Sequence, residues 1–136
     1  MTNVLLHLDV FDDLKLCRKK GWYKSLGQEM PRICRLLNQD GRLPGERSVH
    51  YIKLVDMQGK IFHAGINLPN ENVGKQKGPR IIYFRETLFL CKVLYIGGHK
   101  DKRYDDSYKQ VELIENRFGG GDRYVPFTED LDFEKD

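Results

Sequence analysis

Cationic side chains, a histidine and a tyrosine gather in two segments of the chain, in a combination that suits chemistry on a phosphodiester. The residues are Lys75, Lys77, Arg80, His99, Lys100, Lys102, Arg103 and Tyr104. Cleavage of RNA by attack of the 2′-hydroxyl group requires a base, cations that stabilise the phosphorane, and an acid for the departing 5′ oxygen. Arginine can brace a phosphate with two hydrogen bonds, and histidine, with an ordinary pKa of about 6.5, can be acid or base. These residues predict RNA cleavage without a metal ion or another cofactor.

Two predicted strands bring these segments together. RIIYFRE (80–86) and LFLCKVLYIGG (88–98) have the residue types of neighbouring strands, with a tight turn at Thr87. Antiparallel pairing about that turn places Arg80 near the end of the second strand. Arg80 and the loop from His99 to Tyr104 should then share one edge of the sheet, with Lys75 and Lys77 extending over it from the preceding loop.

The remaining elements predict an α+β fold. A strand is expected over 3–10, helices over 11–20 and about 25–38, a hairpin of HYIKLVD (50–56) and KIFHAGI (60–66), and a helix over 107–118. Helices grouped before hairpin-connected strands favour a helical pair packed on a largely antiparallel sheet of four to five strands. Residues 1–118 form the expected domain. Residues 119–136 are expected to be a Gly-rich linker and a flexible acidic tail.

Charge is distributed unevenly along the chain. The net charge is +3, but residues 129–136 carry −4 and the rest therefore +7, while residues 71–104 contain eight bases and three acids. A basic segment in a chain with an acidic tail favours a polyanionic partner, although a solvated basic surface fits the charge about equally well. No apolar run reaches the length of about 20 residues that spans a membrane, and the N-terminus lacks the features of a signal peptide. Cys17, Cys34 and Cys91 suit buried thiols of a cytoplasmic protein.

The stretch KIFHAGINLPNENVGKQKGPRIIYFRETLFLCKVLYIGGHKDKRY (60–104) resembles the core of RelE/HigB-like toxins. Those proteins have a GK-x-K/S-G loop, an R-hydrophobic-hydrophobic-Y strand, an apolar strand, and a loop rich in His and Lys that ends in Tyr. FDDLKLCRKKG (11–21) and MPRICRLLNQDGRLPG (30–45) are similar to their paired N-terminal helices. The resemblance covers about residues 1–118.

The resemblance implies a microbial RNase-like fold and an endoribonuclease that cleaves mRNA on the ribosome and is silenced by a cognate antitoxin in a hetero-oligomer. It implies that Lys75 and Lys77 contact mRNA or the scissile phosphate and that Arg80 stabilises the transition state. His99, Lys100 and Arg103 match positions where members keep catalytic residues, and Tyr104 matches the tyrosine that closes the loop. Lys102 is taken as a further RNA contact.

Other interpretations of these residues stay open at the level of sequence. A ParE-like toxin that binds DNA gyrase would lack the acid and base residues, and a basic RNA-binding module would show exposed aromatic residues in its strands. Arg80 could instead form an ion pair with Glu86 or Asp101. His99 could be an ordinary surface histidine, and Tyr104 could anchor the following helix. The three other histidines, His7, His50 and His63, are interpreted as structural.

Overall fold

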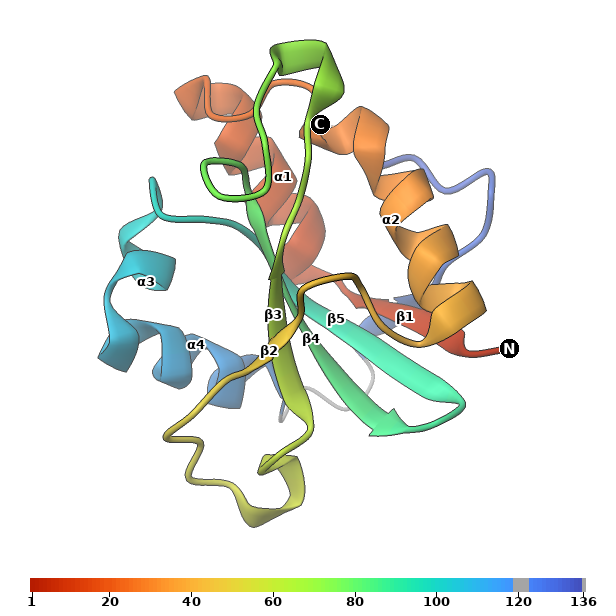
Figure 1. Cartoon of the computed structure of the whole chain (residues 1–136), viewed down its shortest axis with the longest axis vertical. Helices are drawn as coiled ribbons and strands as arrows, with labels where there is room; N and C mark the ends of the chain where they lie inside the picture. Colours follow the sequence, from red (N-terminus) through yellow and green to blue (C-terminus); the bar gives the residue numbers. More distant parts are fainter. Residues whose placement is uncertain (119–122, 136) are drawn as a thin grey trace.

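A mixed six-stranded sheet forms the centre of the protein in a computed structural model that describes residues 1–118 and 123–135 (Figure 1). The strands are β1 (Asn3–His7), β2 (Arg47–Ser48), β3 (Ile61–Gly65), β4 (Arg80–Thr87), β5 (Leu90–Gly97) and β6 (Tyr124–Pro126). Their order is β2-β3-β4-β5-β1-β6, and the β1–β5 pair is parallel whereas the other pairs are antiparallel. The predicted α+β class and largely antiparallel sheet are confirmed, with six strands where four to five were expected.

Helices cover both faces of this sheet (Figure 1). On one face lie α1 (Asp9–Lys20) and α2 (Leu26–Asp40), and each ends at a left-handed glycine, Gly21 or Gly41. On the other face lie the short α3 (Lys102–Asp105) and α4 (Ser107–Phe118). Short 3-10 turns at Val55–Met57 and Pro69–Glu71 complete the elements.

The central strands are buried on both sides, as the apolar sequence of the second predicted strand indicated. Ile81 and Tyr83 of β4 pack with α1 and α2, whereas Ile82 and Phe84 pack with α4 on the opposite face. Burial of both faces holds β4 and β5 rigidly, so the ends of these two strands form a fixed platform.

The segment 50–56 is not a strand, and this expectation was wrong. The pairing on this side of β3 is made by Arg47 and Ser48, which precede the segment, and the following residues form a loop and a 3-10 turn. Ile52 and Met57 point into the core from this loop, whereas Leu54 and Val55 are exposed, so the apolar residues do not form one buried face. The carboxylate of Glu115 in α4 accepts hydrogen bonds from the backbone N–H groups of Lys53 and Leu54. A side chain therefore satisfies donors that a strand would pair with a neighbouring strand.

The C-terminal segment differs from the flexible tail that the sequence suggested. Gly119–Gly121 and Asp122 lie outside the described residues, but β6 pairs with β1, and the segment continues beside α2 (Figure 1). Phe133 is 4% exposed and stacks with Phe11 of α1 at 5.9 Å between ring centroids. Phe133 lies among acidic residues, so the sequence does not show that it is a buried anchor. Burial of its aromatic ring stabilises the segment more than repulsion among the solvated carboxylates destabilises it.

Candidate active site

The start of β4 and the end of β5 meet at one edge of the sheet, as predicted. Arg80 pairs with Gly97, and the loop from His99 leaves the same edge. Gly98 has a φ of 143°, which favours glycine, and a Cβ atom on Gly97 would lie only 2.2 Å from the hydroxyl oxygen of Tyr95. The two glycines thus allow the chain to turn sharply into the loop that carries His99 and Tyr104.

A cleft of about 490 Å³ opens at this edge. Its lining residues come from β2 and the loop before it, from β3, from the start of β4, from the loop after Gly74 and from the segment 99–110. Its ionisable lining residues are Arg47, His63, Lys75, Arg80, His99, Tyr104 and Asp105. With three fixed cations against one carboxylate, the cleft is positively charged even when both histidines are neutral.

Two histidines flank the Tyr104 side chain within the cleft. His63 Nδ1 lies 3.1 Å from the Tyr104 hydroxyl oxygen, and the His99 ring meets the Tyr104 ring edge to face at 5.1 Å. His99 Nδ1 also lies 2.9 Å from a carboxylate oxygen of Asp105. Beneath them, the Tyr104 ring stacks on the buried ring of Tyr95, which fixes its plane. The arrangement brings two potential proton carriers to the same small space.

The surroundings shift the pKa values of two of these groups. Burial lowers the pKa of His63, and the positive charges of Arg80 and Arg47 lower it further. Burial raises the pKa of Tyr104, and the nearby Arg80 partly opposes this rise. At neutral pH His63 is therefore a neutral imidazole that can accept a proton, and Tyr104 keeps its proton.

Arg80 is held by backbone carbonyl groups rather than by an acid. Its guanidinium group donates to the carbonyl oxygens of Lys75 at 2.5 Å, Gln76 at 2.9 Å and Gly78 at 3.1 Å. The ion pairs with Glu86 or Asp101 considered from the sequence do not form, because Glu86 pairs with Lys92 and Asp101 with Arg103. Carbonyl groups carry no net charge, so the guanidinium retains its positive charge within the cleft while its position is fixed.

Gly65 at the end of β3 makes this arrangement possible. A Cβ atom at Gly65 would lie 2.5 Å from the Lys75 carbonyl oxygen and 3.0 Å from Arg80 Nη1. The loop that carries Lys75 can approach the strand so closely only because this position has no side chain.

Four of the eight predicted site residues line the cleft: Lys75, Arg80, His99 and Tyr104. The other four are Lys77, Lys100, Lys102 and Arg103, and they are not among its lining residues. Lys100 Nζ lies over the Tyr23 ring at 4.6 Å, and the Tyr23 hydroxyl group donates to the Lys77 carbonyl oxygen. The side chains of Lys77 and Lys102 are exposed.

His63 and Arg47 line the cleft although sequence analysis did not include them. His63 was interpreted as structural because it lies in a strand pattern. The structure places it opposite Ile82 of β4, two positions from the Gly65–Arg80 pair and on the same face of the sheet. A histidine two residues before a glycine in the strand preceding Arg80 was the available signal, but its use required the register of β3 on β4.

No protein-family model, curated protein sequence or solved structure matches this chain. Among residues 1–118 and 123–135, no helix is both long and apolar enough to cross a membrane. In the same part of the chain, no three His, Cys, Asp or Glu side chains lie close enough together to hold a metal ion.

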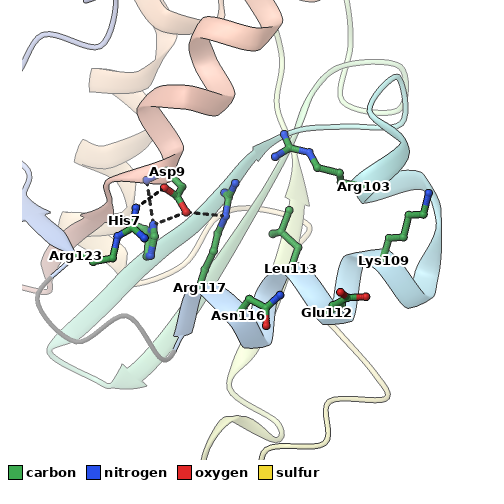
Figure 2. A pocket seen from close by; sticks show the side chains of 9 residues that line it. All are labelled: His7, Asp9, Arg103, Lys109, Glu112, Leu113, Asn116, Arg117 and Arg123. Atoms are coloured by element: carbon green, nitrogen blue, oxygen red, sulfur yellow. Dashed lines mark hydrogen bonds and ion pairs between the residues drawn. The ribbon is translucent and has the colours of Figure 1, made fainter.

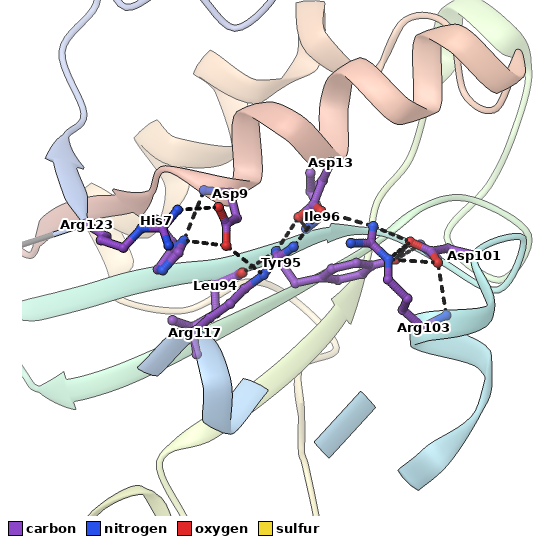
Figure 3. Close-up of polar contacts among 11 residues, drawn as sticks. His7, Asp9, Asp13, Leu94, Tyr95, Ile96, Asp101, Arg103, Arg117 and Arg123 are labelled. Carbon is purple, nitrogen blue, oxygen red and sulfur yellow. Dashed lines mark hydrogen bonds and ion pairs between the residues drawn. The ribbon is translucent and has the colours of Figure 1, made fainter. Parts of the chain in front are cut away.

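Arg103 belongs to a buried ion-pair network beside the cleft (Figure 3). Its guanidinium group donates to Asp101 at 2.8 Å and to Asp13 of α1 at 3.1 Å. Asp13 also accepts two hydrogen bonds from Arg117 of α4, at 2.6 and 2.9 Å. The Tyr95 hydroxyl group donates to Asp101 at 2.9 Å. The network therefore ties the loop of residues 99–104 to α1, α4 and β5, and it pairs the guanidinium group of Arg103 with two acids.

A second hollow of about 520 Å³ lies on the other side of this network, between α4 and the start of α1 (Figure 2). Asp9 accepts a hydrogen bond from Arg123 at 2.8 Å and lies 3.7 Å from Arg117, and His7 Nδ1 accepts from the backbone N–H of Asp9. The arginines that line this hollow form ion pairs with acids, whereas Arg80 in the cleft forms none within the described part of the chain. We therefore interpret the hollow as part of the structural framework.

Proposed function

We propose that this protein is a metal-independent endoribonuclease that cleaves RNA by attack of the 2′-hydroxyl group. The observation that carries the proposal is the cleft in which His63, Tyr104 and His99 lie beside the uncompensated guanidinium of Arg80. A base, an acid and a fixed cation at one place are what this reaction requires.

In the proposed reaction, His63 is the general base. With its proton on Nδ1 it donates to the Tyr104 hydroxyl oxygen, and Nε2 accepts the proton of the 2′-hydroxyl group. The 2′ oxygen then attacks phosphorus, the bond from phosphorus to the 5′ oxygen breaks, and a 2′,3′-cyclic phosphate forms. His99 is the general acid: its Nδ1–H donates a hydrogen bond to the Asp105 carboxylate, and its Nε2–H gives its proton to the departing 5′ oxygen. Arg80 and Lys75 stabilise the added charge on the phosphorane.

The biological role rests on the resemblance of residues 60–104 to RelE/HigB-like toxins. On that basis the proposed substrate is mRNA on the ribosome, the proposed fold is microbial RNase-like, and the proposed location is the cytoplasm. A cognate antitoxin would inhibit the enzyme in a hetero-oligomer. The positive charge of the cleft supports a polyanionic substrate and complements an acidic inhibitor.

Induced expression should arrest protein synthesis and leave cut mRNA whose upstream fragments end in a 2′,3′-cyclic or 3′ phosphate. Incorporation of a labelled amino acid measures the arrest, and chemical analysis of the fragment ends identifies the reaction. Fragments with a 3′-hydroxyl end would contradict the mechanism. If DNA supercoiling were inhibited while mRNA stayed intact, the protein would instead be a toxin that acts on gyrase.

A second prediction follows from the lowered pKa of His63. A general base acts in its unprotonated form, so a lowered pKa extends activity to pH values below the ordinary histidine pKa of about 6.5. The acidic limb of the cleavage rate, measured on ribosome-bound mRNA over about pH 5 to 8, should have its midpoint below that value. His63→Ala should remove this limb and slow cleavage by about a hundredfold or more.

His50→Ala is the matched control, because His50 is an exposed histidine in the neighbouring loop and does not line the cleft. This variant should retain the rate and the acidic limb, with its midpoint only slightly raised, because His50 is the weakest of the charges that lower the pKa of His63. If His63→Ala kept the acidic limb of the parent protein, the base would have to be another residue.

A further inference from the structure

A second groove, here called the tyrosine groove, adjoins the cationic cleft. It has a volume of about 770 Å³ and lies between the loop 51–53 and α4. Tyr51, Ser107, Tyr108 and Glu112 are among its lining residues, and Ser107 also lines the cleft. A chain that extends out of the cleft past Ser107 would therefore enter this groove.

The two tyrosines present their rings to solvent. Tyr51 is 87% exposed and Tyr108 is 90% exposed, although tyrosine normally buries much of its ring. Tyr51 also has a φ of 68°, a left-handed conformation that is unusual for a bulky side chain. Backbone strain of this kind is concentrated at binding sites, where the surrounding structure maintains it.

The loop that carries Tyr51 is anchored on both sides. Glu115 accepts from the backbone N–H of Lys53 at 2.7 Å, and the Gln58 side chain donates to the Ile52 carbonyl oxygen at 3.0 Å. The ring of Tyr51 thus projects from a fixed backbone, and Tyr108 projects from the first turn of α4. Exposed aromatic rings on fixed supports are suited to stack on nucleobases, which are flat and π-rich.

The charge of the groove distinguishes it from the cleft. Its charged lining residues are Lys53, Glu112 and Glu115, which gives it a net charge of −1. The groove therefore does not favour a phosphate group. Glu115 is occupied by the backbone of the loop, whereas the exposed carboxylate of Glu112 has no hydrogen-bond partner among residues 1–118 and 123–135. A carboxylate accepts hydrogen bonds from the exocyclic amino groups of adenine, cytosine and guanine. Uracil has no amino group, and its one donor on this edge, N3–H, lies between two carbonyl oxygens that repel a carboxylate.

We propose that the tyrosine groove binds a nucleobase of single-stranded RNA next to the scissile phosphate. Tyr51 and Tyr108 stack on the base, and Glu112 accepts from its exocyclic amino group. The groove therefore prefers adenine, cytosine or guanine to uracil. This proposal rests on the proposed ribonuclease function, because it is the phosphate in the cleft that places the neighbouring base at the groove.

Binding of 2′-O-methyl trinucleotides to the full-length protein tests the proposal independently of catalysis, since these RNAs lack the attacking hydroxyl group. NMR spectra of labelled tyrosine rings follow the titrations with all-adenine, all-cytosine and all-uracil probes. The rings of Tyr51 and Tyr108 should shift, and Tyr51→Ala with Tyr108→Ala should each weaken binding by about tenfold. Glu112→Gln should reduce the preference for adenine and cytosine over uracil, because its amide N–H₂ can donate to uracil.

Phe89→Ala is the control, because Phe89 is a 67% exposed aromatic residue at the distant turn between β4 and β5. This variant should bind like the parent protein. Unchanged binding in both tyrosine variants would overturn the proposal, as would equal binding of all three probes by the parent protein. If the two tyrosine variants lost binding to a protein partner while their RNA binding was unchanged, the proposal would also be overturned and the groove would be assigned to that partner. Failure of the ribonuclease function would appear separately, as uncut mRNA.

Discussion

Arg80→Ala should slow RNA cleavage by about a hundredfold to a thousandfold, the usual effect of removing one preorganised contact to a transition state. The guanidinium is fixed in advance by the carbonyl groups of Lys75, Gln76 and Gly78, so it needs little reorganisation when charge develops on the phosphorane. The same substitution loosens the loop that carries Lys75, which adds to the loss. Because these effects act on the transition state, kcat should fall more than KM rises.

Arg80→Lys should restore little activity. Lysine keeps the positive charge but lacks the planar fork that donates to several carbonyl groups at once. Cleavage of ribosome-bound mRNA and growth arrest measure activity, and a thermal melt verifies the fold. Arg42→Ala provides the matched control, because Arg42 is exposed and does not line the cleft. If the Arg80→Ala protein folded normally and stayed fully toxic, Arg80 would serve only to hold its loop in place.

The largest effect on stability is expected at Asp13. Its side chain is 1% exposed, and it accepts hydrogen bonds from Arg117, Arg103 and the backbone N–H of Ile96 (Figure 3). Asp13→Ala removes the carboxylate that accepts two hydrogen bonds from the buried Arg117 and leaves, among the described acids, only Asp9, at 3.7 Å, beside that guanidinium group. Removal of one member of a buried ion pair costs about 3–5 kcal/mol. The free energy of unfolding from urea titrations should fall by this amount.

A compensated variant separates lost charge pairing from lost packing. Asp13→Leu combined with Arg117→Met removes both charges and should recover part of the stability, because apolar residues can replace a buried ion pair. Asp12→Ala is the control, as Asp12 is the exposed neighbour of Asp13 on the same helix. If Asp13→Ala melted like this control, the network would contribute nothing to folding.

Much of the local structure, and part of the site, was readable in the sequence. The helix predicted over 107–118 coincides with α4, and glycines mark the ends of α1 and α2. Strand periodicity and a tight turn put Arg80 on the same edge as His99 and Tyr104, which the register confirms. These features depend on neighbours within a few positions in the chain, where hydrophobic period, turn residues and helix ends act directly.

Contacts between distant segments were decided only by the tertiary structure. Arg103 has the residue type of a phosphate ligand, but Asp13, 90 positions earlier, draws it into a buried network. His63 joins the site through the register of β3 on β4, and Phe133 attaches the acidic segment to α1. Composition and spacing do not encode such pairings, because each depends on which side chains the packed helices and the sheet bring within a few ångströms of one another. The sequence by itself thus determined most of the helices and central strands and the edge at which Arg80, His99 and Tyr104 meet, whereas packing decided which charged groups remain available there.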